Sequence, residues 1–314
     1  MDPVAQPAVS RRRLLWWLGG GLATLAAGGA VTVDLIDHGV LPGKQVLDQL
    51  DGACSVPEPS LSFATLGPSY SGHFFSRARR RPVGYTIAYP PGHQRRDALS
   101  LIVVLHGYGD DHTSALKGMT PAQAVALRPR LEPMALVTVD GGNGYWTPHP
   151  HDDPMAMVRE ELIPLCQGWG LGRPPQQIKL LGISMGGFGA LAMAEADPQL
   201  FLGVAAISPA IWTTFGQAQA ANDIAFASRA AFERYDVVTH AYRLAGIPLR
   251  VAVGRDDPFY PGVDAFLRAA PHVERVAITA GCHTDSFFLS QEPPSLDFLS
   301  RYVVHGTSGA VSSD

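Results

Sequence analysis

The stretch from Gln177 to Met193, QIKLLGISMGGFGALAM, carries the strongest structural signal in the sequence. A short apolar run of strand formers meets Gly-Ile-Ser-Met-Gly at positions 182–186, and an alanine-rich helical pattern follows at once. This order of strand, glycine-bounded turn and helix is the context of a nucleophile elbow, which holds a serine, here Ser184, above a sheet. Glycines are expected at 182 and 186 because larger side chains there would collide with neighbouring backbone.

The composition predicts a folded α/β protein and excludes several other classes. The chain has 314 residues, of which 46% are hydrophobic and 17% charged, so it is long enough to bury a large core. A net charge of −4 gives no basic surface for nucleic acid, which is not an expected partner. The three cysteines match no zinc or redox spacing. One disulfide with one free thiol and three unpaired thiols both remain open for Cys54, Cys166 and Cys282.

The N-terminus has the anatomy of an export signal. Arginines at 11–13 precede two tryptophans and an apolar run that reaches Val33, and Ser-Arg-Arg-x-Leu-Leu at 10–15 resembles the twin-arginine translocation signal. Residues 1–34 are therefore expected to be a signal or a membrane anchor. Small residues at 28–30 offer a cleavage site without a clean Ala-x-Ala, and residues 14–33 are long enough to associate with a membrane as a span. We expect an exported chain, secreted or anchored at the outer face of the cytoplasmic membrane.

The remaining sequence divides into a linker, one large domain and a short tail. Proline-rich breakers at 41–43 and 56–59 predict a linker over residues 35–60. A catalytic domain is expected over 61–305. Residues 306–314 are small and polar, which predicts a disordered tail.

Strand and helix patterns alternate along the domain. An alternating segment at 81–92 predicts an outer strand, and the unbroken apolar run at 101–105 predicts a central parallel strand buried on both faces. Further strands are predicted at 134–139, in the apolar run before the elbow, and at 202–207, 249–253 and 273–279. Helical patterns lie between them, the last over 285–304 with a break at Pro293 and Pro294. Residues 218–242 predict a small helical cap. The alternation predicts an α/β fold with a mostly parallel central sheet and helices on both faces.

Polar clusters follow several of these strands at the point where each strand ends. Ligands of such sheets bind beyond the carboxyl ends of the strands, so we expect the clusters to form one site. Nucleophilic acyl transfer needs a serine, a carboxylate and a histidine, in that chain order in this type of fold. Ser184 and His283 fit the first and last positions. The spacing from Gly254 selects Asp257 as the acid, with Asp256 as the alternative.

The sequence also predicts the groups around this triad. The oxyanion hole is expected from the backbone N–H groups of Tyr108 and Met185. Tyr145 and Trp146 are candidates for the wall of the acyl or leaving-group pocket, with plain packing an equal alternative. The full set of expected substrate-binding residues is His106, Gly107, Asn143, Tyr145 and Trp146.

The sequence His-Pro-His-Asp-Asp at 149–153 gathers imidazoles and carboxylates, so a metal site is one interpretation. A polar, proline-containing loop is more often a solvated rim of a pocket, and this is the interpretation that we prefer. Neither a metal nor an organic cofactor is expected.

The motifs together resemble the esterase D family of esterases, which includes S-formylglutathione hydrolases, feruloyl-type esterases and mycolyltransferases. The resemblance covers roughly residues 83–304 and implies an α/β-hydrolase fold with a Ser184, Asp257 and His283 triad. A departure at Cys282-His283-Thr284 leaves the local pocket chemistry open. The matching segments are GISMGGFGAL at 182–191, ISP at 207–209, YPPG at 89–92, LHG at 105–107, ELIP at 161–164 and GRDDPF at 254–259.

Three functions follow, in order of preference. The first is an exported or membrane-anchored serine carboxylesterase that hydrolyses small-molecule or lipid acyl esters through an acyl-enzyme on Ser184. The second is a mycolyltransferase-like acyltransferase acting on cell-envelope glycolipids, which export and the family resemblance motivate. The third is a non-catalytic envelope scaffold protein. A binding module has no need of an intact triad, which argues against the third.

Overall fold

A computed structural model describes residues 54–57, 66–116, 133–174 and 178–302. The chain divides into two units, Met1–Cys54 and Ser55–Asp314, and the fold below is that of the second. The predicted signal or anchor, most of the predicted linker and the tail lie outside the described residues. Within the described ranges no helix has the length and apolarity needed to cross a membrane.

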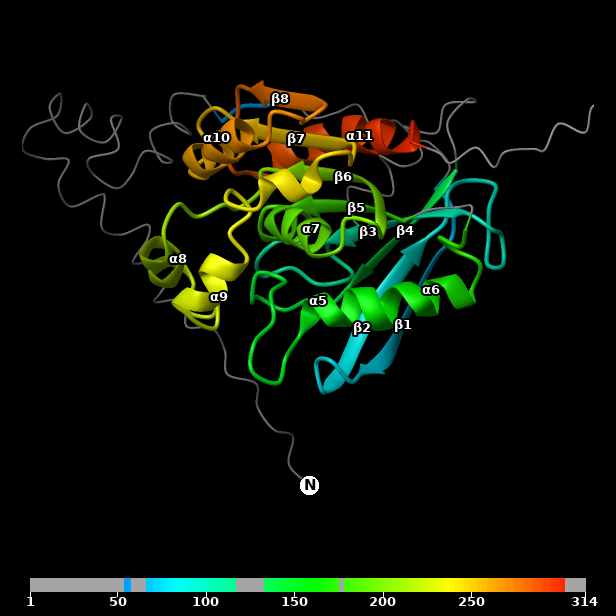
Figure 1. Cartoon of the computed structure of the whole chain (residues 1–314). Helices are drawn as coiled ribbons and strands as arrows, with labels where there is room; N and C mark the ends of the chain where they lie inside the picture. The colour runs from blue at the N-terminus through cyan, green and yellow to red at the C-terminus, as the bar shows by residue number, and fades with distance from the viewer. Residues whose placement is uncertain (1–53, 58–65, 117–132, 175–177, 303–314) are drawn as a thin grey trace, which may run out of the picture. The chain divides into compact units, whose positions relative to one another are not determined.

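An eight-stranded sheet forms the centre of the domain, in the order β1-β2-β4-β3-β5-β6-β7-β8 (Figure 1). β1 pairs antiparallel with β2 and β2 with β4, and all other pairs are parallel. The mostly parallel sheet that the alternation predicts is thus confirmed. The strands are β1 (Ser69–Ser76), β2 (Arg81–Ala88), β3 (Ser100–Leu105), β4 (Met134–Val139), β5 (Ile178–Ile183), β6 (Phe201–Ile207), β7 (Leu249–Gly254) and β8 (Arg275–Thr279).

Both faces of the central strands are buried, which explains their unbroken apolar sequence. Along β3, Leu101 and Val103 pack into one hydrophobic cluster, while Ile102 and Val104 pack into a second cluster on the opposite face. Successive side chains of a strand point to opposite faces, so both sets must be apolar.

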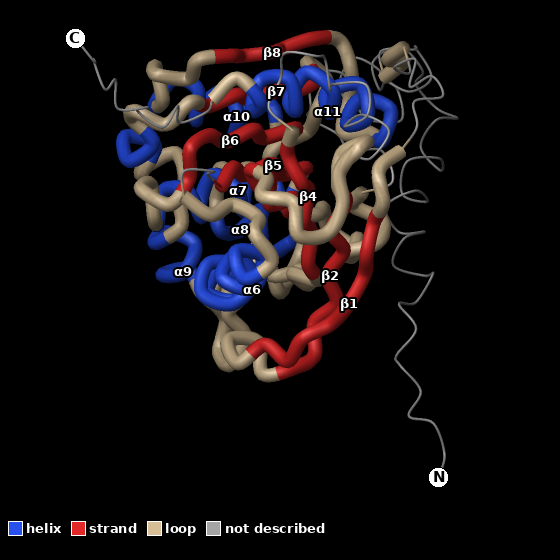
Figure 2. Tube along the Cα trace, turned by 90° about the vertical axis from the view of Figure 1, so that its right-hand side faces the viewer, coloured by secondary structure: helices blue, strands red, loops and turns tan. Residues whose placement is uncertain are grey.

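Helices cover the two faces, as Figures 1 and 2 show. On one face lie the continuous run of α5 (Pro154–Ala156), η1 (Met157–Leu162) and α6 (Ile163–Gly168), together with α7 (Met185–Ala196) and α10 (Tyr260–Ala269). On the other face lies α11 (Asp285–Ser300). The cap region between β6 and β7 contains three short helices, α8 (Phe215–Ala221), α9 (Arg229–Arg234) and η2 (Ala241–Leu244).

The edge of the sheet differs from the prediction. The segment expected to be the outer strand is β2, and its outer neighbour β1 went unpredicted. β1 reads SYSGHFFS, and apart from its last residue it is exposed or half-buried throughout. Its weak apolar alternation gave no strand signal, because it is the antiparallel pairing with β2 that holds it in place.

The C-terminal helix also differs from the prediction. Pro293 and Pro294 lie inside α11, which continues without a break to Ser300. Each proline removes one hydrogen bond from the helical ladder. Packing of the buried apolar side chains of α11, such as Phe287 and Leu299, against the sheet outweighs that loss. The Ser295 hydroxyl also donates to the carbonyl of Gln291 at 2.7 Å.

The turn between β5 and α7 has the strained geometry of the predicted elbow. Ser184 has φ 56° and ψ −117°, a region that residues with a side chain rarely occupy. A Cβ atom on Gly182 would lie 2.0 Å from the carbonyl oxygen of Gly186, and one on Gly186 would lie 1.9 Å from that of Leu105. Only glycine permits so close an approach of backbone to backbone.

We therefore expect Gly186→Ala to lower the free energy of unfolding by about 3 kcal/mol or more, because its methyl group overlaps a buried carbonyl of β3. The control is Gly216→Ala in α8, where a Cβ atom meets nothing within 4 Å. This exposed helical substitution should be neutral or raise stability by up to about 1 kcal/mol. Urea unfolding of both variants measures the difference. Equal stabilities of the two variants would contradict the steric argument.

Candidate active site

The three residues predicted as a triad come together at the carboxyl edge of the sheet. Ser184 Oγ lies 2.8 Å from His283 Nε2, and His283 Nδ1 lies 2.8 Å from Asp257 Oδ2. An ionised carboxylate only accepts hydrogen bonds, so Nδ1 carries the proton and Nε2 faces the serine with its lone pair. The arrangement therefore has a hydroxyl, a base that can remove its proton and a carboxylate that orients the base.

The acid of this arrangement is held rigidly. The Asp257 side chain is 0% exposed, and its second oxygen accepts the backbone N–H of Phe259 at 2.8 Å. The His283 ring lies between the rings of Phe259 and Phe288, each with a centroid distance of 5.0 Å. Both the carboxylate and the imidazole are thus fixed by packing as well as by hydrogen bonds. The carboxylate that contacts His283 belongs to Asp257, the acid that the spacing selects.

The two amides predicted for the oxyanion hole lie on either side of the serine. Met185 is the first residue of α7, so its N–H belongs to the positive end of the helix dipole. The loop after β3 passes beside Ser184, since a Cβ atom on Gly107 would lie 3.7 Å from that of the serine. Neither the Met185 nor the Tyr108 amide donates to another residue in the described ranges. Tyr108 as a whole residue is 60% exposed.

Asn143 connects the loop after β3 to the cap. Its side-chain oxygen accepts the backbone N–H of Gly109 at 2.9 Å. Its own carbonyl accepts the side-chain amide of Asn222 at 2.9 Å, from the end of cap helix α8. Asn143, expected at the substrate, thus supports the loop that presents the Tyr108 amide. No local pattern pointed to Asn222, because only the folded cap brings it there.

His106 lies beneath the same loop, with the side chain buried. Its Nδ1 lies 2.7 Å from the carbonyl of Gly107, and its Nε2 accepts the N–H of Gly141 at 2.9 Å. Nδ1 must therefore carry the proton and Nε2 must be bare, which is the neutral form. Burial lowers the pKa of the imidazole, which keeps that form at neutral pH. Both ring nitrogens are occupied, so His106 joins two loops and has none left for a substrate.

The two aromatic candidates are both buried. Trp146 is 0% exposed and donates its indole N–H to the carbonyl of His106 at 3.2 Å. Tyr145 accepts the indole N–H of Trp212 at 2.6 Å, and its ring packs on Phe188. The sequence left open whether Tyr145 and Trp146 form a pocket wall or pack in the core, and in this structure both pack in the core.

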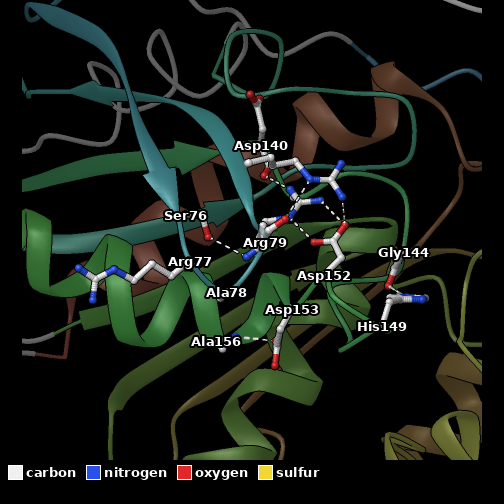
Figure 3. Close-up of polar contacts among 12 residues, drawn as sticks. Ser76, Arg77, Ala78, Arg79, Asp140, Gly144, His149, Asp152, Asp153 and Ala156 are labelled. Carbon is white, nitrogen blue, oxygen red and sulfur yellow. Dashed lines mark hydrogen bonds and ion pairs between the residues drawn. The ribbon is translucent and has the colours of Figure 1, made fainter.

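The loop at 149–153 is held by hydrogen bonds and ion pairs with protein groups (Figure 3). Asp152 accepts from Arg79 at 2.7 Å and from Arg81 at 2.6 Å. Asp153 caps α5 through the N–H of Ala156 at 2.8 Å, and His149 donates to the carbonyl of Gly144. The carboxylates already have cationic or N–H partners, and within the described ranges no cluster of metal-ligating side chains occurs. Arg79, which the sequence did not single out, also donates to the carbonyl of Asp140 and so braces the loop that carries Asn143.

Two of the three cysteines are disulfide-bonded and the third is a free thiol, which is one of the two arrangements that the sequence left open. Cys54 and Cys282 are disulfide-bonded, and Cys282 directly precedes His283. Cys166 is a free thiol on the buried side of α6. Burial raises its pKa to about 12, so it is not a reactive thiolate at neutral pH.

The family described as "Putative esterase" matches residues 76–265, which is more than half of the chain. The chain belongs to this family. Its enzyme class is therefore that of the serine hydrolases that act on carboxylic esters, and the scaffold alternative falls away. No curated protein shows significant sequence similarity to this esterase.

Solved structures share the α/β-hydrolase fold, which confirms the predicted fold. A ferulic acid esterase has a TM-score of 0.65 and 17% identity, with 76% of this chain and 100% of that chain covered. An S-formylglutathione hydrolase from Agrobacterium tumefaciens has a TM-score of 0.63 and 18% identity, with 79% and 99% covered. A fluorophosphonate-binding serine hydrolase of Staphylococcus aureus has a TM-score of 0.59 and 14% identity, with 75% and 99% covered.

The Asn143 contacts predict a catalytic effect without loss of the fold. Asn143→Ala removes the acceptor for the Gly109 N–H, so the loop loosens and the esterase kcat should fall roughly 10-fold with KM little changed. Asn222→Asp is the companion variant. It keeps an oxygen for the N–H of Ile224 but has no N–H to donate to Asn143, so a smaller loss in kcat is expected.

Kinetics with a p-nitrophenyl ester and thermal unfolding of both variants provide the measurement. Unfolding temperatures should stay close to that of the wild type. A loss of activity that tracks a loss of stability in both variants would refute the positioning role.

Proposed function

We propose that the protein is an exported or membrane-anchored carboxylesterase whose acyl-enzyme forms on Ser184. The observation that carries the proposal is the unbroken hydrogen-bonded series from Ser184 through His283 to Asp257, set on a strained elbow. The strain holds the hydroxyl in one direction, toward the site and toward the base.

The chemistry follows from the positions of the protons. His283 Nε2 takes the proton of the Ser184 hydroxyl as Oγ bonds to the carbonyl carbon of the ester. The tetrahedral intermediate collapses, and Nε2 returns the proton to the departing alcohol oxygen. Water then repeats the sequence on the acyl-enzyme and releases the acid. Asp257 stays ionised and stabilises the imidazolium in both halves.

The negative charge that develops on the carbonyl oxygen needs donors in place beforehand. The amides of Met185 and Tyr108 fill this role, since neither donates to another described residue and the first lies at the N-terminus of α7. The loop contacts of His106 and Asn143 hold the Tyr108 amide in position.

Export is supported by the twin-arginine-like segment and by the state of the cysteines. Disulfides persist in compartments outside the reducing cytosol, and Cys54 and Cys282 are disulfide-bonded. A route that carries folded proteins suits a chain whose active-site loop contains a bonded cysteine. The proposed location is the extracytoplasmic side of the membrane, released or anchored.

Hydrolysis of p-nitrophenyl esters from acetate to palmitate by the full-length chain tests the proposed nucleophile. Ser184→Ala should lower kcat by about four orders of magnitude, because the remaining groups only bind and polarise the ester. Ser69→Ala, an exposed serine on β1, is the control and should keep full activity. An active Ser184→Ala variant would refute the acyl-enzyme.

The same assay with trehalose added separates hydrolysis from transfer. The esterase assignment requires free acid as the main product with and without the sugar. Acylated sugar in place of free acid would move the assignment to the acyltransferase.

Export is tested by changing the paired arginines. Arg11→Lys with Arg12→Lys keeps the charge but removes the pair, so the protein should accumulate in the cytoplasm. Arg13→Lys, at the variable position of the motif, should be exported as the wild type is. Fractionation followed by immunoblotting reads out both, and equal export of the double variant would contradict this route.

A further inference from the structure

A pocket of about 550 Å³ lies away from the triad, and none of the three triad residues lines it. One wall is the loop that leads into β3 at Ser100, and the other is the segment that follows α6 and precedes β5. These two segments meet where the N–H of Gly172 donates to the carbonyl of Leu99 at 2.8 Å. Because β3 and β5 are parallel, both segments lie at the amino ends of these strands, whereas the triad lies at the carboxyl ends.

Aromatic rings form the floor and sides of this pocket. Tyr85 and Trp169 lie with ring centroids 5.5 Å apart, and Tyr70 and Tyr89 meet edge to face at 5.9 Å. Tyr89 is almost completely buried, whereas Trp169 is half-buried. The pocket has the size of small-molecule sites and a lining that is part aromatic and part charged. Flat rings offer a surface on which the C–H face of a sugar packs.

The charges at the opening are all of one sign. Arg95, Arg96 and Arg173 line the pocket, and no carboxylate does. Among the described residues none of the three has an acidic partner within ion-pairing distance. Arg95 stacks on Tyr70 at 4.1 Å, and Arg173 donates to the carbonyls of Gln167 and Gly168.

Arg95 and Arg96 lie on an exposed loop whose single carboxylate has other partners. Asp97, the acid of that loop, lies 3.1 Å from the His93 ring and also accepts the N–H of Gln94. Arg96 has φ 80°, a left-handed conformation that is uncommon for a residue with a side chain. Because Asp97 pairs with His93 and Gln94, it does not neutralise Arg95 or Arg96, and both guanidinium groups can bind an anion. A guanidinium pairs with phosphate through two parallel hydrogen bonds.

We propose that this pocket binds a phosphorylated sugar, with the ring against Tyr85 and Trp169 and the phosphate paired with Arg95 and Arg96. The aromatic floor alone would accept a neutral sugar, and the arginines alone would accept any anion. Their combination selects a ligand that has both parts. The ligand is either a free sugar phosphate or the phosphorylated inositol headgroup of a lipid. The site is remote from the triad and does not depend on the proposed reaction.

Isothermal titration calorimetry of the full-length protein with glucose 6-phosphate and with glucose is the first experiment. Saturable binding of glucose 6-phosphate is expected, with glucose at least about 10-fold weaker, since it lacks the charge. Arg95→Gln with Arg96→Gln should weaken binding about 10-fold or more. Arg268→Gln, which changes an exposed arginine on α10 outside the pocket, should leave it unchanged.

Two further experiments separate this pocket from the catalytic site and a lipid ligand from a soluble one. Trp169→Leu should weaken glucose 6-phosphate binding while Ser184→Ala should not, which separates this site from the catalytic one. Sedimentation with phosphatidylcholine vesicles, with and without phosphatidylinositol phosphate, distinguishes the lipid source from the soluble one.

The proposal is supported if glucose 6-phosphate or the phosphatidylinositol phosphate vesicles bind, and if the double arginine variant and Trp169→Leu both weaken that binding. The proposal is overturned if neither probe binds, if glucose binds as tightly as its phosphate, or if the double arginine variant binds like the wild type. Thermal unfolding of each variant confirms that it is folded before binding is read.

Discussion

The close approach of three backbone segments around Ser184 is the constraint on which the rest of the site depends. Gly182 and Gly186 allow β5, the first turn of α7 and the end of β3 to lie almost in contact. The strained serine is held in place by its neighbours, since its N–H donates to Ile207 and its carbonyl accepts from Ala210, both at 2.9 Å. Backbone strain of this kind persists only where the surroundings fix it on several sides.

Hydrogen bonds and an ion pair between loops hold the ends of several strands together as one site. The loop after β3 is joined to the loop after β4 by His106 and by Asn143, and the cap is joined to the latter loop by Asn222. Below them, the pairing of Arg79 with Asp152 ties the β1–β2 turn to the same region. Most of these groups are buried or half-buried, so their hydrogen bonds are less open to competition from water than surface contacts are. The loop that carries the Tyr108 amide is thus held in place by its contacts with the loop after β4.

The two ends of the sheet differ in chemistry. At the carboxyl ends lie an imidazole between a hydroxyl and a buried carboxylate, and two amides that donate to no other described residue. This set suits a reaction in which negative charge appears briefly on oxygen. Near the amino ends of β3 and β5, three arginines that pair with no acid among the described residues share a pocket with aromatic rings, which suits a ligand with a permanent negative charge. One sheet can carry both because its strands separate the two ends, and each loop set evolves its own surface.

The sequence by itself determined the parts of the protein that are local or follow a fixed chain order. The elbow, the buried strands, the mostly parallel sheet and the candidates Ser184, Asp257 and His283 could all be predicted, because each leaves a short pattern of glycine, apolar or polar residues. Tertiary structure alone decided the rest. Only packing keeps α11 continuous through Pro293 and Pro294, and only pairing with β2 makes a strand of β1. For the same reason the sequence did not reveal the loop contacts of His106, Asn143 and Trp146: which atoms a side chain meets depends on contacts between residues far apart in the chain, and no local pattern records them.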